Sequence, residues 1–277
     1  MYFMRYPGGK SKALTLSYDD GVEQDIHLLD LMEKYGIKGT FNLNSGLFAE
    51  EGTVFPKGRV HRRLTLLRAK ELYNSEMCEV AGHAFTHPFL EKMNVDSALW
   101  EVAHDRYSLE QIFERRVQGF AYPFGTYNDD VVNALKTSGY KYARTTISSH
   151  NFNVPTDWLR LAATCHHNDE MLPELAEKFI NTTPNDAPYF FYVWGHSYEF
   201  EANDNWSVIE DFFAAVGGKD DVWYATNVEL YDYITAFDRL EFSCDCKRVF
   251  NPSAVDVYIG RGNRIVCVPA GQEVSDL

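Results

Sequence analysis

Two adjacent carboxylates, Asp19 and Asp20, directly follow an alternating apolar run and precede a glycine. The alternation over residues 13–18 predicts a buried strand that carries both acids at its C-terminal end. Two ionised carboxylates side by side repel each other, so a bound divalent metal ion is the simplest group that would stabilise them. The alternative is an ordinary turn, because Asp and Gly both favour turns.

Two histidines four residues apart, His83 and His87, follow a second apolar run. On one turn of helix, or in a tight loop, this spacing places both imidazoles on one side. One Asp and two His would give a metal ion three protein ligands and leave positions open for water and substrate. Such an open site is typical of a hydrolytic metal, and the second Asp is then free to act as a base.

A third histidine position, His196, comes just after the long apolar run at residues 189–194. Histidine titrates near neutral pH and can donate a proton to a leaving group. Taken alone, His196 could equally be an ordinary loop histidine, since the chain contains nine histidines. Because three predicted strands end in residues of this kind, we interpret the three ends as parts of one catalytic centre.

Predicted strands and helices alternate along most of the chain. Strands are predicted at residues 37–43, 78–81, 119–122, 140–144, 159–163, 189–194 and 222–225. Helices are predicted at residues 24–35, 66–74, 95–115, 129–137, 169–180, 208–215 and 228–237. This order predicts parallel strands with right-handed crossovers, and it favours a distorted (β/α) barrel of about seven strands over an open doubly wound sheet. In a barrel the loops that follow the strands meet at one face.

The pattern changes near residue 239. Short strand-like runs broken by Asn, Pro and Gly follow, without a helical period. They predict a small antiparallel β appendage at residues 239–277, after a barrel domain at residues 1–238.

Composition narrows the class of partner. The 277 residues include 26 basic and 40 acidic side chains, a net charge of −14, which argues against nucleic acid or an anionic membrane as the main partner. The chain has no apolar run long enough to span a membrane and no secretory signal, so we expect a cytoplasmic protein, with a secreted mature fragment as the alternative. Five scattered cysteines indicate reduced thiols.

The motifs SYDDG, HAFTH, YPFG and a strand followed by GHS occur in this order in the chain. The order resembles the polysaccharide deacetylase family, also known as the NodB homology domain or carbohydrate esterase family four, over roughly residues 10–235. The resemblance implies a distorted barrel of seven strands and a Zn²⁺ or Co²⁺ centre. It also implies the removal of acetyl groups from amino sugars or acetylated polysaccharides.

The resemblance further implies individual roles. Asp19 matches the general base of the family and Asp20 matches a metal ligand. His83 and His87 match the other two ligands, and His196 matches the general acid.

Four residues match positions that line the substrate side of the active site in the family. The backbone amide of Phe124 falls where the family binds the developing oxyanion, a function that any residue with an N–H can serve. Tyr122 and Pro123 would shape the wall beside it, and Trp194 would contact substrate.

The chain departs from the family pattern in the third motif. Ala121 replaces the arginine that usually braces the base, so another cation must serve Asp19 or the pKa of Asp19 is tuned differently. Arg144 and Arg160 are the candidates.

The fourth motif has two possible equivalents. It usually supplies an Asp near a Trp to support the catalytic His. Asp157 and Trp158 match by residue type, whereas His166 and His167 lie at the predicted strand-to-helix junction, where a supporting residue is expected. Both pairs remain candidates for the fourth motif.

Two other functions are consistent with the sequence. One is a related metal-dependent hydrolase that cleaves the C–N bond of a small amide or cyclic ureide. The other is a carbohydrate-binding relative without catalysis, which Ala121 favours and the retained set of candidate ligands, base and acid argues against.

Overall fold

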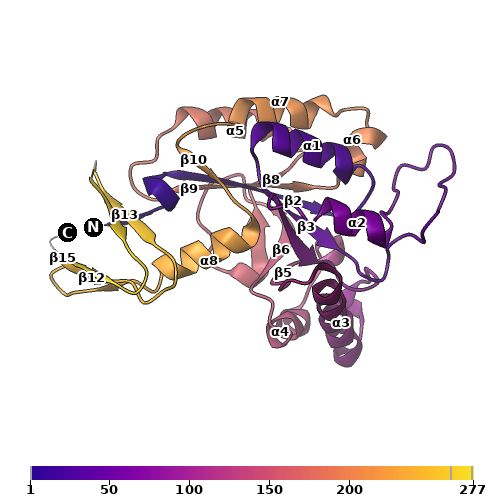
Figure 1. The fold of residues 1–277 in the computed structure, drawn as a ribbon, viewed down its shortest axis with the longest axis horizontal. Coiled ribbons are helices and arrows are strands. Elements are labelled where there is room, and N and C mark those ends of the chain that lie inside the picture. Colours follow the sequence, from indigo (N-terminus) through magenta and orange to yellow (C-terminus); the bar gives the residue numbers. More distant parts are fainter. Residues whose placement is uncertain (1, 263, 276) are drawn as a thin grey trace.

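A curved sheet of parallel strands forms the centre of the protein (Figure 1), seen in a computed structural model that describes residues 2–262, 264–275 and 277. Each strand pairs in parallel with its neighbours, as the alternation of strands and helices predicts. The strands are β2 (Lys12–Asp19), β3 (Gly39–Leu43), β4 (Cys78–Gly82), β5 (Gly119–Ala121), β6 (Tyr142–Ser148), β7 (Leu161–Ala163), β8 (Cys165–His166), β9 (Tyr189–Gly195) and β10 (Val222–Tyr224).

The sheet closes through β7 and β8, which only Thr164 separates. β7 pairs with β6, whereas β8 pairs with β9, and the Thr164 N–H donates to the Tyr192 carbonyl at 2.8 Å. The ring therefore runs from β2 through β3, β4, β5, β6 and the combined β7–β8 segment to β9, which pairs with β2. Seven strands complete the ring, with β10 added beside the start of β2. This confirms the distorted barrel in preference to the open sheet.

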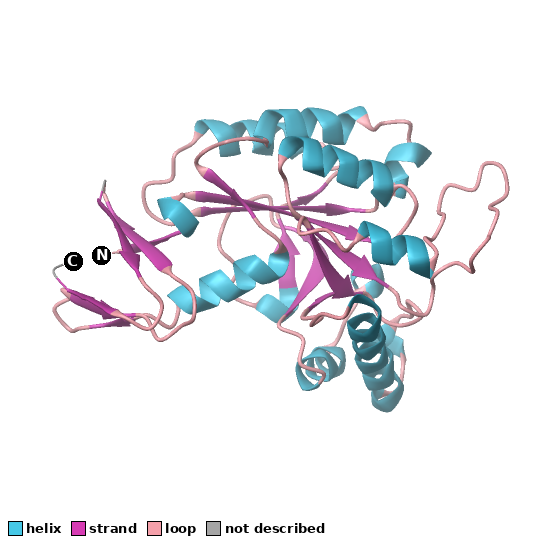
Figure 2. Cartoon of the chain, viewed as in Figure 1, coloured by secondary structure: helices cyan, strands magenta, loops and turns pink. Residues whose placement is uncertain are grey.

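Helices cover the outside of the barrel (Figure 2). Helix α1 ends where Gly36 adopts a left-handed conformation (φ 66°), which glycine adopts readily at the end of a helix. The short helix α6 is not predicted, and it carries a residue of the site described below. The helices are α1 (Asp25–Tyr35), α2 (Leu66–Leu72), α3 (Val95–Phe113), α4 (Asp129–Thr137), α5 (Leu172–Asn181), α6 (Tyr198–Ala202), α7 (Ser207–Val216) and α8 (Asn227–Phe237).

Strand β2 is buried along all eight of its residues. Two of its polar side chains form hydrogen bonds inside the barrel. Thr15 Oγ1 donates to Asn227 Oδ1 at 2.8 Å, and Ser17 Oγ accepts from Asn42 Nδ2 at 2.7 Å. A strand that pairs with neighbouring strands on both sides is a rigid support for the residues at its end.

Small antiparallel sheets gather at one end of the molecule, beside both termini (Figure 1). The predicted C-terminal antiparallel strands are confirmed, and the N-terminal strand β1 (Phe3–Arg5) joins them by pairing with β13. The boundary at residue 238 stays a prediction. The remaining strands are β11 (Glu241–Phe242), β12 (Arg248–Phe250), β13 (Val257–Arg261), β14 (Arg264–Val268) and β15 (Glu273–Ser275).

All five cysteines are free thiols. Among the residues that the structure describes, none of the helices combines the length and the apolar character needed to cross a membrane.

Candidate active site

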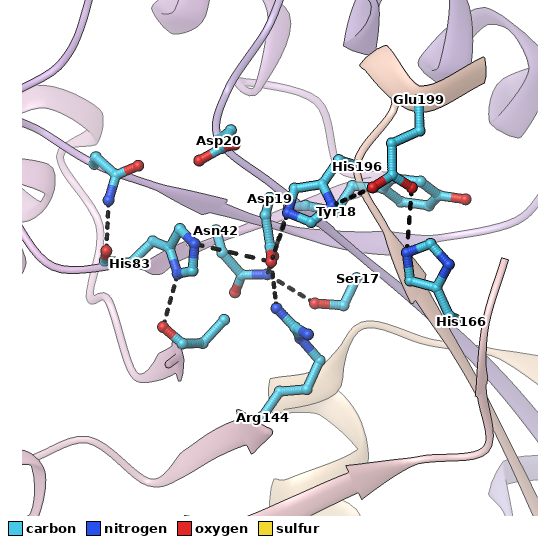
Figure 3. A network of polar contacts seen from close by, with 12 residues as sticks. Ser17, Tyr18, Asp19, Asp20, Asn42, His83, Arg144, His166, His196 and Glu199 are labelled. Carbon is cyan, nitrogen blue, oxygen red and sulfur yellow. Dashed lines mark hydrogen bonds and ion pairs between the residues drawn. The ribbon is translucent and has the colours of Figure 1, made fainter. Parts of the chain in front are cut away.

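Strand β2 ends at the site and positions both neighbouring acids. Asp19 is its last residue and is 2% exposed. Asp20 has a positive φ of 83°, a conformation that few residues other than glycine adopt. This backbone turn separates the two carboxylates, so that Asp19 lies in the centre of the polar network while Asp20 lies to one side (Figure 3).

Asp19 lies among an arginine, an asparagine and two histidines. Its Oδ2 accepts from Arg144 Nη2 at 2.5 Å, and its Oδ1 accepts from Asn42 Nδ2 at 2.7 Å. The Nε2 atoms of His83 and His196 each lie 3.8 Å from Oδ2. Burial alone would raise the pKa of Asp19, but Arg144, followed by the two histidines, holds it below its usual value. Asp19 is therefore ionised at neutral pH.

The cation that contacts Asp19 comes from β6, one strand away from the position on β5 where the family pattern has an arginine. Arg144 pairs with Ala121 in the register of β5 and β6, so it lies directly across from the position where the family pattern places an arginine. Its side chain is buried, and the guanidinium lies 4.2 Å from the centre of the Trp194 ring. Arg160, the other candidate, instead forms surface ion pairs with Asp129 and Asp157.

Asp20, His83 and His87 come together as their spacing predicts. Their candidate ligand atoms all lie within 4.8 Å of one another. His83 Nδ1 is 2.7 Å from the Ala121 carbonyl oxygen, which fixes the proton on Nδ1, and its buried Nε2 has no hydrogen-bond partner. An imidazole held in this way presents a free lone pair, as a metal ligand requires. Burial lowers the pKa of His83 to about 4, so the ring is neutral.

Two residues of the long loop between β3 and α2 also contact Asp20. His61 Nε2 lies 3.1 Å from Asp20 Oδ2, and Arg63 Nη2 donates to Oδ1 at 2.8 Å. Burial opposes ionisation of Asp20, but His61 and then Arg63 hold its pKa well below the usual range. Sequence analysis missed both residues, because no motif marks them within the loop.

The loop that carries His83 and His87 is held by two acids of helix α3. Asp105 Oδ2 accepts from the His83 N–H at 3.0 Å, and Glu101 accepts from both the N–H and the hydroxyl of Thr86, at 2.8 and 2.7 Å. Both acids are buried, and their spacing of four residues places them on one face of the helix. They stabilise a loop in which Ala84 and His87 both have positive φ.

His196 lies on the other side of Asp19, with an acid of its own. Its Nδ1 is 3.1 Å from Glu199 Oε1, in the first turn of α6. Burial would lower the pKa of His196, but Glu199 and Asp19 raise it above the usual value, so His196 keeps its proton to higher pH than a free histidine does. Glu199 was missed by sequence analysis, although its spacing of three residues from His196 was a signal.

The structure separates the two candidate equivalents of the fourth motif. His166 Nε2 and His167 Nε2 lie 3.3 and 3.0 Å from Glu199 Oε2, so both contact the acid that supports His196. Asp157 instead caps a surface turn and pairs with Arg160, while Trp158 packs against Tyr231. The supporting carboxylate thus comes from Glu199, and not from Asp157.

The predicted wall residues lie in the turn after β5. Tyr122 is buried and donates its hydroxyl to the Leu159 carbonyl at 2.7 Å, and Pro123 is also buried. Phe124 has a φ of 59°, and its ring centre is 4.5 Å from that of His87. Trp194 is 7% exposed, and its buried Nε1 has no hydrogen-bond partner among the described residues.

Comparisons with known proteins agree with the fold. Residues 6–143 match the profile of the family described as polysaccharide deacetylase. A Mycobacterium smegmatis protein assigned as a polysaccharide deacetylase has a similar structure, with a TM-score of 0.58, 16% identity, and coverage of 84% of this chain and 93% of that one. No curated protein sequence matches the chain.

Two further solved structures are similar to parts of the chain. One is a mutant, with restored enzymatic activity, of a CE4 family pseudoenzyme from Bacillus anthracis (TM-score 0.50, 16% identity, 83% of this chain and 70% of that one). The other is the Streptococcus pyogenes deacetylase PplD in complex with acetate (TM-score 0.42, 26% identity, 48% of this chain). The chain spans 55% of the length of PplD. From its motifs, its barrel and the profile match, the chain belongs to the polysaccharide deacetylase family.

Proposed function

We propose that this protein is a metal-dependent hydrolase that removes acetyl groups from N-acetylated or O-acetylated oligo- or polysaccharides. One observation carries the proposal. Oδ2 of Asp19 and Nε2 of His196 lie 3.8 Å apart, beside three metal-ligand candidates, with the pKa of Asp19 lowered and that of His196 raised. Two titratable groups whose environments push their pKa values in opposite directions are the expected signature of a base and an acid.

Asp20, His83 and His87 would hold one divalent ion, with Zn²⁺ expected first and Co²⁺ as the alternative. The unpartnered Nε2 of His83 supports this fit. A divalent ion bound there would polarise the acetyl carbonyl and bring the pKa of a coordinated water toward neutral.

The residues of the chain supply the proton transfers. Asp19, held by Arg144 and Asn42, takes the proton of the attacking water. The Phe124 N–H would donate to the developing oxyanion, a contribution of about 3 kcal/mol for one such donor. His196, kept protonated by Glu199, then gives its proton to the departing amine or alcohol. The products are acetate and a free sugar amine or hydroxyl.

The position of Arg144 supports catalysis over the non-catalytic alternative. Ala121 was the feature in favour of a non-catalytic binding protein, because it removes the arginine that usually contacts the base. Arg144, which pairs with Ala121 across β5 and β6, binds Asp19 instead, so Ala121 no longer argues against catalysis.

Acetate release from N-acetylated chitooligosaccharides tests the proposal. The metal-free protein should be inactive, and Zn²⁺ or Co²⁺ should restore release. His83→Ala should stay inactive, whereas His150→Ala, which removes a histidine paired with Asp169 at the surface, should behave like the wild type. Metal-independent release, or no release from chitooligosaccharides, acetylated xylans and other acetylated sugars alike, would overturn it. Turnover of small amides instead would support the C–N hydrolase alternative.

A further inference from the structure

Two phenylalanines form an exposed aromatic stack next to the candidate active site. The rings of Phe89 and Phe124 lie parallel (10°), with their centres 3.8 Å apart. Their side chains are 39% and 51% exposed. Large apolar groups that gather at the surface mark binding sites more often than single exposed residues do.

The stack is held in place by its surroundings. Phe89 and Phe124 belong to two turns, after β4 and after β5, and Glu91 Oε2 joins these turns by accepting from Thr126 Oγ1 at 2.7 Å. Phe124 adopts a positive φ, a strained conformation for a residue with a side chain. The strain is stored where the aromatic ring is exposed, which points to a function for the ring.

The two rings of the stack have different neighbours. Lys92 Nζ lies 3.8 Å from the centre of the Phe89 ring. Because Phe124 occupies one face of Phe89, Lys92 must occupy the other. Phe124 is the more exposed of the two rings, and Phe89 packs against one of its faces. Since the Phe124 ring contacts His87, a candidate metal ligand, this surface borders the reaction site.

We propose that Phe124, backed by Phe89, is a stacking platform for a pyranose ring next to the acetylated sugar. This inference rests on the proposed function and narrows its substrate to oligosaccharides of at least two sugar units. The C–H face of a pyranose is apolar, so it suits the exposed aromatic ring of Phe124. A small amide would reach the metal ligands without touching the platform.

Phe89→Ala tests the platform without altering the Phe124 amide. The value of kcat/KM for an N-acetylated chitotetraose should fall roughly tenfold, mainly through KM, whereas that for N-acetylglucosamine should not change. Phe89→Tyr should retain most of the tetramer activity. Phe242→Ala, which removes a similarly exposed ring of the β appendage, is the matched control and should have no effect.

Equilibrium binding of the same tetramer to metal-free protein gives a readout that does not require catalysis. The tetramer should bind the Phe89→Ala variant roughly tenfold more weakly than the wild type. If the wild type releases no acetate but this difference in binding is present, the proposed function fails and the platform stands. If the wild type releases acetate and Phe89→Ala leaves both the binding and the tetramer-to-monomer preference unchanged, the platform is overturned.

Discussion

Arg144 donates from Nη2 to Oδ2 of Asp19 across 125 positions of sequence, and both side chains are almost fully buried. The pair forms because β6 lies beside β5 in the barrel and Arg144 is in register with Ala121. An arginine on the neighbouring strand thus reaches the same carboxylate that the family pattern braces from the third motif. The site keeps its buried cation although the motif has lost it.

Replacing the buried arginine should change the acid side of the pH profile. In Arg144→Gln the largest influence that lowers the pKa of Asp19 is gone, so this pKa should rise. A base acts only when ionised, so the acid limb of kcat/KM should move to higher pH, with the loss of activity greatest at low pH. Arg160→Gln, at the surface, should leave the profile unchanged. An acid limb that stays in place in Arg144→Gln would show that Arg144 does not tune Asp19.

Much of the fold was predictable because its signals are local. The strand that ends at Asp19 and the helix predicted at residues 24–35 depend on short patterns of apolar residues, and both are confirmed. The partners of the two acids were harder to predict. Arg144 could be named only as one of two candidates, because strand register decides which arginine reaches Asp19.

Other parts of the site had weaker signals or none. Glu199 lies on α6, a helix of five residues that is too short to show a helical period. His61 and Arg63 reach Asp20 from a loop without regular structure, so their contacts depend on tertiary packing alone.

Removal of the Glu199 charge should affect the alkaline side of the pH profile. Glu199 raises the pKa of His196 by hydrogen bonding and charge, so Glu199→Gln should lower it. An acid acts when protonated, that is, below its pKa. The alkaline limb of kcat/KM should therefore shift to lower pH. Glu201→Gln, on the same helix but bonded to Arg62 and Gln24, is the control. Identical alkaline limbs in Glu199→Gln and the wild type would contradict this role.

The two acids of α3 should set how tightly the metal is held. Asp105→Asn and Glu101→Gln should each weaken the hydrogen bonds that hold the loop of His83 in place. The affinity for Zn²⁺ should therefore fall by about 10- to 100-fold. The visible absorption spectrum of the Co²⁺ protein should change as well, which a simple loss of stability would not produce. Glu110→Gln on the same helix, where the acid pairs with Arg106, should leave both unchanged. Wild-type affinity and spectrum in both variants would rule out the positioning role.

Metal binding should stabilise the folded protein. A ligand that binds only the native state at 100 times its Kd adds about 2.7 kcal/mol to the free energy of unfolding. Thermal melts of metal-free protein should therefore shift upward with Zn²⁺, and His87→Ala should reduce the shift. Since His104 is not in the predicted ligand set, His104→Ala should retain it. A melting temperature that does not respond to Zn²⁺ or Co²⁺ in the wild type would contradict a native metal site.

The most direct test of the proposed chemistry is to measure acetate release and metal content together in Asp19→Asn. Asparagine keeps the shape of the side chain but cannot accept the proton of the attacking water. We expect turnover to fall by at least about 10²- to 10⁴-fold, the usual contribution of a general base, with one metal ion per chain still bound. Asp20→Asn should instead lose metal affinity. Normal turnover in Asp19→Asn would contradict the account.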